Sequence, residues 1–169
     1  MWRLGMMMAA ALLAFSTVAA EAADSALSSA ANAAFLADYA KKPGVYRRSS
    51  GLLYRILQNG FGTRPTATDL VSVYYSGKLV NGHRFDATEP GFPAEFPVNG
   101  VIPGWTEALE LMREGDHWEL VIPANLGYGS RGQGDTIPPN QTLIFDVQLV
   151  KVSPPPPKDK DKDDSDAQQ

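Results

Sequence analysis

Val101-Ile102-Pro103-Gly104-Trp105 stands near the middle of the chain and opens an apolar repeat with the period of an α-helix. From Ile102 to Met112, the apolar side chains fall on one face and the charged ones fall off it. The apolar set is Trp105, Ala108, Leu109 and Met112, and the charged set is Glu107, Glu110 and Arg113. This pattern predicts one amphipathic helix that buries a single face.

On both sides of this helix the pattern changes to that of β-strands. Before it, residues 52–57 alternate and Leu70–Leu79 is rich in Val and Tyr; after it, Glu119–Ile122 and Thr142–Val152 return to strand. Asn81-Gly82 predicts a two-residue hairpin loop with positive φ angles. Several antiparallel strands and one helix predict an α+β domain, in which a curved sheet wraps its apolar face around the helix.

Residues 1–20 have the features of a secretory signal peptide. A single early cation, Arg3, precedes an apolar stretch from Met6 to Val18, and small residues follow at an A-x-A-like cleavage site. The alternative is a membrane anchor, but the apolar run is shorter than the roughly 20 residues that span a bilayer. We therefore predict cleavage, residence in the periplasm with secretion left open, and no membrane contact after cleavage.

The remaining 149 residues suit one ordinary domain with two appendages. An Ala/Ser-rich lead-in covers residues 21–50, with a short helix around Asn32–Lys42 that Pro43-Gly44 stops. The central domain covers residues 51–152. Residues 153–169 hold four prolines followed by mixed Lys and Asp with almost no apolar side chain, so we predict a disordered tail.

Composition and motifs exclude several classes of function. The formal net charge of −4 argues against nucleic acid as a partner, and the absence of cysteine excludes disulfides and thiolate chemistry. His83 and His117 stand in no recognisable metal-binding pattern, so we predict neither metal nor cofactor. Residues 127–132 spell G-x-G-x-x-G, but Pro138-Pro139 forbids the helix that a dinucleotide site needs. A glycine-rich flap over a pocket fits better.

Aromatic and aliphatic residues recur around the helix in the company of one carboxylate. The set comprises Phe85, Asp86, Ile102, Trp105, Tyr128, Ile137 and Phe145. It suits a cavity that binds an apolar ring, such as that of proline, and contains no nucleophile. By base rate, Phe85, Trp105 and Phe145 are ordinary core residues. Composition alone leaves pocket and core both open.

The motifs, in their order, resemble those of the FKBP family of peptidyl-prolyl isomerases, the immunophilins that bind macrolides. The similarity covers about Gly51 to Val152. It rests on Val73-Tyr74-Tyr75-Ser76-Gly77, Gly82-His83-Arg84-Phe85-Asp86, Val101-Ile102-Pro103-Gly104-Trp105, Gly127-Tyr128-Gly129 and the run from Ile137 to Asp146. The lead-in from Ala34 to Leu52 is similar to that of the bacterial envelope branch, which includes the macrophage infectivity potentiators.

This resemblance implies an FKBP-like fold and isomerase activity without a cofactor. It implies catalytic roles for Asp86, Tyr128, Ile102 and Phe85. It implies substrate binding by Tyr75, Phe85, Phe96, Val101, Ile102, Trp105, Tyr128, Ile137 and Phe145. The implied partners are X-Pro segments of unfolded or exported proteins, and macrolides such as rapamycin. Two positions at the rim depart from the best-known members: Ala94 replaces an aromatic residue, and Gly100 replaces an acidic one.

Two other functions stay open at this point. A periplasmic holdase chaperone or binding module would use the same pocket without significant isomerase activity, and would need a second apolar surface. A structural envelope protein tethered through the Pro-rich tail has only that tail in its favour. We also expect a monomer, because Phe35, Leu36 and Tyr39 form one small apolar stripe, far less than a stable dimer buries.

Overall fold

The computed structural model describes residues 26–155. The predicted signal peptide, and the predicted tail from residue 156 on, lie outside the described residues. Within residues 26–155, no helix is long and apolar enough to cross a membrane.

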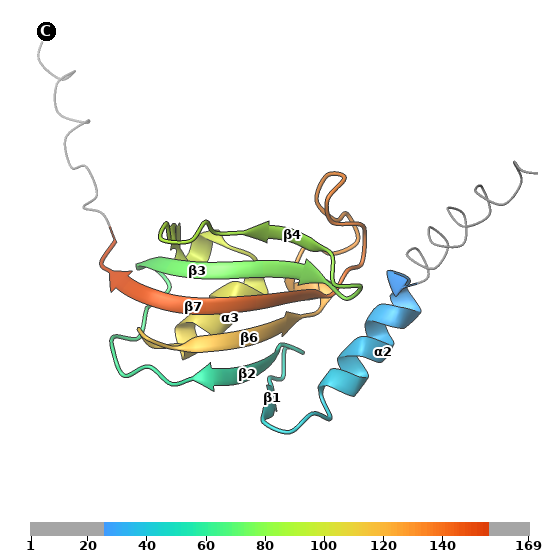
Figure 1. The fold of residues 1–169 in the computed structure, drawn as a ribbon, viewed down its shortest axis with the longest axis horizontal. Coiled ribbons are helices and arrows are strands. Elements are labelled where there is room, and N and C mark those ends of the chain that lie inside the picture. Colours follow the sequence, from blue (N-terminus) through green and yellow to red (C-terminus); the bar gives the residue numbers. More distant parts are fainter. Residues whose placement is uncertain (1–25, 156–169) are drawn as a thin grey trace, which may run out of the picture.

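Seven antiparallel strands form one curved sheet (Figure 1). They are β1 (Val45–Arg47), β2 (Leu53–Gln58), β3 (Leu70–Leu79), β4 (Arg84–Ala87), β5 (Ala94–Pro97), β6 (His117–Ile122) and β7 (Leu143–Ser153). The strand order is β1-β2-β6-β7-β3-β4, and β5 pairs with β3 beside β4. One long strand, β3, therefore carries β4 on the half that contains Gly77 and β5 on the half that contains Val71.

Helix α3 (Pro103–Leu111) packs against one face of the sheet, as the sequence predicts. Pro103 lies in its first turn, where a missing N–H costs nothing. The buried face carries Trp105, Ala108 and Leu109, which join the core with inward-facing strand residues such as Leu120. The helix ends one residue before the predicted end, because Met112 has an extended backbone with ψ of 164°. The predicted α+β architecture is confirmed.

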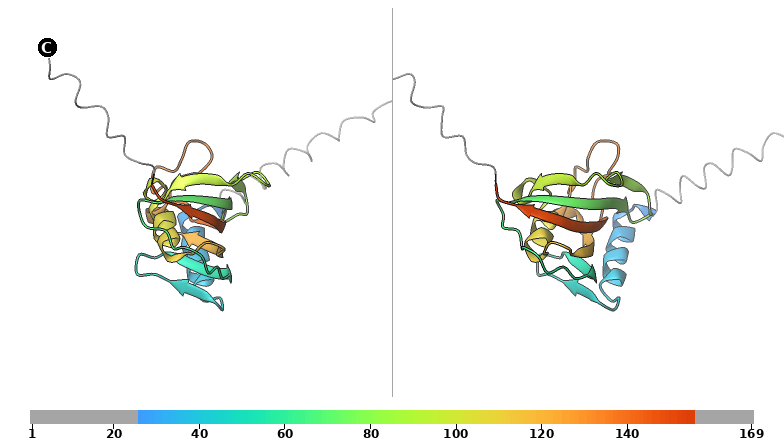
Figure 2. Two further views of the ribbon diagram at one scale, coloured as in Figure 1. Left: turned by 90° about the vertical axis from the view of Figure 1, so that its left-hand side faces the viewer. Right: turned by 60° about the vertical axis from the view of Figure 1, so that its left-hand side comes forward.

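Helix α2 (Ser29–Tyr39) covers part of the opposite face of the sheet. Its Tyr39 packs with Leu53, Val121 and Ile144, whereas the neighbouring residue Leu52 faces the α3 side. The right-hand view of Figure 2 shows α2 and α3 on either side of the strands. The helix begins three residues earlier than predicted, because the Ser28 side chain caps it by accepting a bond from the Ala31 N–H at 3.2 Å.

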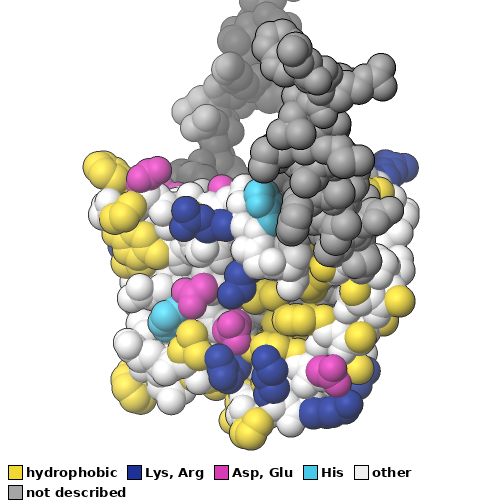
Figure 3. All heavy atoms as spheres, turned by 45° about the vertical axis from the view of Figure 1, so that its right-hand side comes forward, with side chains coloured by type: hydrophobic (Ala, Val, Ile, Leu, Met, Phe, Trp, Pro, Cys, Tyr) yellow, Lys and Arg dark blue, Asp and Glu magenta, His cyan; other side chains and the backbone are white. Residues whose placement is uncertain are grey.

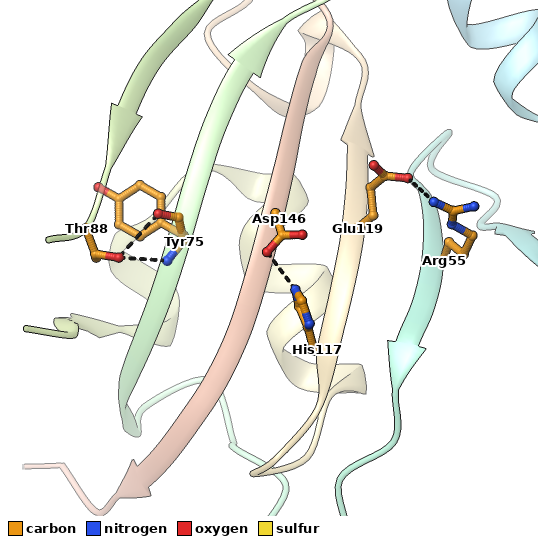
Figure 4. A network of polar contacts seen from close by, with 6 residues as sticks. All are labelled: Arg55, Tyr75, Thr88, His117, Glu119 and Asp146. Carbon is orange, nitrogen blue, oxygen red and sulfur yellow. Dashed lines mark hydrogen bonds and ion pairs between the residues drawn. The ribbon is translucent and has the colours of Figure 1, made fainter. Parts of the chain in front are cut away.

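The uncovered part of this outer face is polar. Figure 3 shows side chains of both charge signs interspersed over the surface turned toward the viewer. Two polar contacts join neighbouring strands there: an ion pair between Arg55 and Glu119 at 3.1 Å and a hydrogen bond between His117 and Asp146 at 2.6 Å (Figure 4). His117 thus has a partner side chain on the neighbouring strand.

The β3–β4 hairpin differs from the prediction. The loop has three residues, Val80 to Gly82, and the Leu79 N–H closes it on the carbonyl of His83 at 2.9 Å. Only Gly82 has a positive φ, of 86°, whereas a two-residue loop of the predicted type needs positive φ at both positions. Asn81 instead accepts a bond from the His83 N–H through its side chain, at 2.9 Å. The predicted two-residue turn is therefore wrong, and a type I turn with a bulge takes its place.

Candidate active site

A cavity of about 690 Å³ opens at the N-terminal end of α3. All ten residues with a predicted site role line it: Tyr75, Phe85, Asp86, Phe96, Val101, Ile102, Trp105, Tyr128, Ile137 and Phe145. They come from β3, β4, β5, α3, β7 and two connecting loops. The volume lies within the usual range of small-molecule and peptide sites, about 300 to 1,000 Å³. The structure thus brings the predicted residues together, while their individual roles stay predictions.

The indole of Trp105 forms the floor of this cavity. The Trp105 side chain is only 4% exposed, and rings meet it edge to face: Tyr75 and Phe145 at 5.3 Å and Phe96 at 6.0 Å between centroids. Such T-shaped pairs are the favoured geometry for aromatic rings. The result is a rigid, apolar cup whose base is one flat ring system.

A glycine in β3 makes room for two of the walls. At Gly77, an added Cβ would stand 2.6 Å from the ring of Phe145 and 2.7 Å from the ring of Phe85. Those two rings pack against each other at 5.5 Å. Any side chain at position 77 would push them into the cavity, so Gly77 shapes the site without lining it.

Among residues 26–155, Asp86 is the only one that lines the cavity with a carboxylate, and it is exposed at the rim. The Tyr75 hydroxyl donates a hydrogen bond of 2.6 Å to Asp86 Oδ2. Thr88 fixes the backbone of Tyr75, accepting from its N–H at 3.1 Å and donating to its carbonyl at 3.3 Å (Figure 4). The carboxylate is thereby held in one orientation at the mouth of an apolar cup.

Both phenols of the cavity are held neutral. Burial raises the pKa of Tyr75 well above its usual range, and the hydrogen bond to Asp86 and the charge of that carboxylate add to the effect. Burial also raises the pKa of Tyr128, with the charge of Asp86 as the second cause. The Tyr128 hydroxyl therefore keeps its proton and can donate a hydrogen bond into the cavity.

A backbone donor lies at the entrance of α3. The carbonyl of Ile102 accepts from the N–H groups of Trp105 and Thr106, whereas no residue of the described part accepts from the Ile102 N–H itself. The Thr106 hydroxyl bonds the carbonyl of Val98 at 2.7 Å and fixes this corner. A free N–H beside an apolar cup can bind a ligand carbonyl.

Four lining residues were not predicted as site residues: Gly100, Gln133, Gly134 and Thr136. Gln133, Gly134 and Thr136 directly follow the glycine-rich segment 127–132 that predicted a flap, and we call residues 127–139 the flap. The flap folds back through a bridge between Gln133 and Ile137. The glycine-rich composition was the available signal, but it does not tell which flap residues face inward.

Residues 62–150 match the protein family described as FKBP-type peptidyl-prolyl cis-trans isomerase. Residues 5–56 match the domain amino-terminal to that isomerase. The first match covers more than half of the chain. The chain belongs to the FKBP family.

Individual relatives agree with this assignment. The FKBP-type 22 kDa peptidyl-prolyl cis-trans isomerase of Escherichia coli is 53% identical over 70% of this chain and 58% of its own length. The outer membrane protein MIP of Legionella longbeachae is 50% identical over 70% of this chain and 52% of its own. The crystal structure of FkpA from Escherichia coli superposes with a TM-score of 0.72 at 40% identity, over 86% of this chain and 71% of that one.

The chain spans only about half the length of such relatives, between 45% and 58% of the first three. The similarity therefore identifies the FKBP domain, whereas the activity and partners of the whole protein are matters for proposal.

One feature of this FKBP domain joins the lead-in helix to the flap. Asn32 of α2 and Gln141, each 4% exposed, bond side chain to side chain at 3.2 Å. The Asn32 side-chain oxygen, Oδ1, also accepts from the Thr142 N–H at 2.7 Å, and the Gln141 side chain donates to the backbone carbonyl of Pro139 at 2.9 Å. Beside them, the Asn140 N–H donates to the carbonyl of Gly129 at 2.8 Å. Asn140 itself has a left-handed backbone, with φ of +61°.

This buried cluster fastens both ends of the flap. Tyr128 lies directly before Gly129, and Ile137 lies two residues before Pro139, so the cluster sets the position of two cavity walls. The side chain that starts it comes from a helix on the other face of the sheet, 109 residues away in the sequence.

Proposed function

We propose that this protein is a peptidyl-prolyl cis-trans isomerase that assists the folding of exported proteins. The observation that carries the proposal is the apolar cup over Trp105, with one oriented carboxylate at its rim, in a chain of the FKBP family. The family match favours this activity over a holdase without isomerase activity.

The reaction needs shape and polarity rather than a reactive group. Rotation about an X-Pro bond meets a barrier of about 20 kcal/mol, because the planar amide loses resonance as it twists. The twisted amide has less charge separation than the planar one. A dry aromatic cavity therefore favours the twisted form relative to the hydrated planar form. Each 1.4 kcal/mol or so of this preference accelerates the reaction about tenfold.

The cavity residues divide this work among them. Trp105 supports the proline ring, and Tyr75, Phe85 and Phe145 surround it. The Ile102 N–H and the Tyr128 hydroxyl bind substrate carbonyls on either side of the twisting bond. Asp86, held by Tyr75, faces the rotating carbonyl and orients the peptide at the rim.

The experiment that tests the activity is the isomerisation rate of a short X-Pro peptide, with and without rapamycin. We expect acceleration that rapamycin suppresses. Tyr128→Phe should lower kcat/KM by about tenfold, since it removes one hydrogen bond to the substrate and leaves the ring. Tyr74→Phe, which changes a tyrosine that does not line the cavity, is the matched control. No acceleration on any X-Pro peptide would refute the isomerase assignment.

We further propose that residues 1–20 are cleaved and that the mature protein works in the periplasm as a monomer. The support for export is the Arg3-led apolar segment, and the support for a monomer is that Tyr39 buries itself against its own sheet. N-terminal sequencing of protein from its native host and sedimentation at micromolar concentration test the two statements. An intact Met1 in the membrane fraction would contradict the first, and a dimer that survives dilution the second.

Asn32→Ala should lower isomerase activity although Asn32 does not line the cavity. The substitution frees the flap, and a misplacement of about 1 Å in a site can cost up to about a hundredfold in rate, so we expect kcat/KM to fall about tenfold. Tyr39→Phe is the matched control, because it removes the other buried anchor of α2, the 2.5 Å bond to Glu119, and leaves the flap untouched. Equal activity losses in both variants, measured where both are folded, would mean that α2 acts only through stability.

Alkaline pH should destabilise the native protein before it abolishes the hydrogen bonds of the site. The pKa values of Tyr39, Tyr75 and Tyr128 are all raised in the folded state, mainly by burial. The unfolded chain loses these protons near the ordinary pKa of about 10, so their stabilising contribution is complete below that pH and declines above it. Urea unfolding and tyrosinate absorbance at increasing pH check this. Ionisation of all six tyrosines of the native protein near pH 10, as in free tyrosine, would contradict it.

A further inference from the structure

A second hollow, of about 530 Å³, lies at the C-terminal end of α3. We call this hollow the Trp118 groove. Its lining includes three aromatic residues and two arginines: Tyr54, Phe61, Trp118, Arg64 and Arg113. It shares no lining residue with the cavity described above. The isomerase mechanism leaves it without a role.

The apolar wall of the Trp118 groove is a stack of aromatic rings. Tyr54 lies over Trp118 at 4.6 Å with planes 8° apart, and Tyr46 continues the stack from Tyr54 at 5.2 Å and 18°. Phe61 stands beside this wall with 92% of its surface exposed, and Tyr46 is 53% exposed. Exposed aromatic surface beside a hollow is typical of a binding surface.

The exposed charged residues that line the groove are two arginines. Arg64 has no hydrogen-bond or ion-pair partner within residues 26–155, and Arg113 bonds only a backbone carbonyl, that of Gly62, through its guanidinium at 3.3 Å. The nearby carboxylate of Asp116 is only 5% exposed, and it accepts the N–H groups of Gly60 and Arg113. The Asp116 carboxylate is therefore buried in the wall with both oxygens bonded to backbone N–H groups, whereas Arg64 and Arg113 are exposed.

The described chain ends beside this groove. The Val152 N–H donates to Glu114 Oε1 at 2.6 Å, and the backbone of Glu114 bonds that of Gly62 and Thr63 at 3.1 and 3.0 Å. These bonds fasten the end of β7 to the loop that carries Phe61 and Arg64. Figure 1 shows the end of β7 and the β2–β3 connection at the same end of the molecule.

We propose that the chain's own C-terminal segment, Pro154 to Asp166, docks in the Trp118 groove. Four prolines, Pro154 to Pro157, are followed by three lysines and five aspartates. Proline-rich segments favour the extended polyproline II form and bind grooves lined by aromatic rings. At about 3.1 Å per residue, thirteen residues reach about 40 Å, enough to cross the groove. The prolines contact the rings, and the aspartates beyond the last lysine pair with Arg64 and Arg113.

Composition alone predicts disorder, because the tail has too few apolar side chains to form a core of its own. Docking in a groove needs no such core. Proline has little backbone freedom left to lose on binding. The docked segment covers exposed aromatic surface at the end of α3 remote from the isomerase cavity, so activity on short peptides stays as it is without docking.

Paramagnetic NMR on the full chain tests the proposal. The chain has no cysteine, so Ser165→Cys gives one attachment point for a nitroxide label. We expect stronger broadening of the Trp118 indole N–H and the Phe61 amide than of the Trp105 indole N–H. Because the tether alone keeps the label near the groove, the decisive comparison is with Phe61→Ser plus Arg64→Glu. This exposed pair of changes leaves the tether intact and should abolish the excess broadening.

Replacement of the four prolines by alternating glycine and serine should abolish the excess as well. Added salt should weaken it, because the arginine pairs are exposed to solvent. Four results would each overturn the proposal: equal broadening at both indoles, preferential broadening at Trp105, an excess that survives the groove changes, or broadening of an isotope-labelled chain by the tail of a separate spin-labelled copy. An excess that survives the groove changes would mean that the label is near the groove only because of its tether. Broadening by a separate copy would mean that the tail of a second chain occupies the groove.

Discussion

Trp105→Ala should cost both stability and activity, with the largest combined effect of any single change in the site. Trp105 is 4% exposed and holds Tyr75, Phe96 and Phe145 around it, so its removal opens a void that costs about 3–5 kcal/mol of unfolding free energy. The same void removes the surface that we propose supports the proline ring. Urea unfolding and X-Pro isomerisation, measured on the same preparation, report the two losses.

Trp118→Ala is the matched control for this change. Trp118 is equally buried, at 5% exposed, and lies outside the isomerase cavity. It should lose a similar amount of stability and, while folded, keep its kcat/KM on short peptides. If Trp118→Ala loses as much activity as Trp105→Ala under conditions where both are folded, the proposed support of the proline ring by the Trp105 indole is wrong.

Asp86→Leu should have the opposite balance, a large loss of activity with little loss of stability. The side chain is exposed, and leucine keeps its approximate volume, so the core is unchanged. Loss of the charged partner removes the orientation of the rim and costs about 1.5–3 kcal/mol in the transition state, which is roughly a ten- to hundredfold fall in kcat/KM.

Asp146→Leu provides the control, because the chain contains a second Phe-Asp pair. Asp146 follows Phe145 as Asp86 follows Phe85, and both phenylalanines line the cavity. Asp146, however, lies on the outer face with His117. Asp146→Leu should leave kcat/KM unchanged. Full activity in Asp86→Leu, or an equal loss in Asp146→Leu, would contradict a role for the rim carboxylate.

A further variant, Tyr75→Phe, separates the charge of Asp86 from its orientation. It keeps the ring against Trp105 and removes the hydroxyl that bonds Asp86 at 2.6 Å. If orientation matters, Tyr75→Phe reproduces part of the Asp86→Leu loss; if only the charge matters, Tyr75→Phe retains wild-type kcat/KM.

The sequence by itself determined the fold class of this protein and, through the resemblance of its motifs to those of the FKBP family, most of the residues around its cavity; the strands β1 and β5 were not predicted. The period of the Ile102–Met112 segment and the alternation in the strands are local properties, since each follows from which side of a helix or strand a side chain occupies. The motifs that carry Phe85, Trp105 and Tyr128 are short and contiguous as well. Local pattern was therefore enough for the fold class, whereas the candidate site followed from the resemblance of these motifs to those of the FKBP family.

Local pattern was not enough to predict the geometry of the turn between β3 and β4. Asn81-Gly82 favours a two-residue loop, but the register of β3 against β4 shifts between Gly77 and Lys78 and leaves room for a third loop residue. Registers are fixed by the packing of the whole sheet, so the turn followed the strands rather than its own sequence preference.

Only the tertiary structure decided which distant residues meet. The bond between Asn32 and Gln141 spans 109 residues, and Gly77 matters because two rings from other strands close over it. The Trp118 groove likewise combines a loop, a strand edge and the end of α3. No periodicity encodes such contacts, because they depend on strand order and on the face that each side chain occupies after the sheet has closed around its helix.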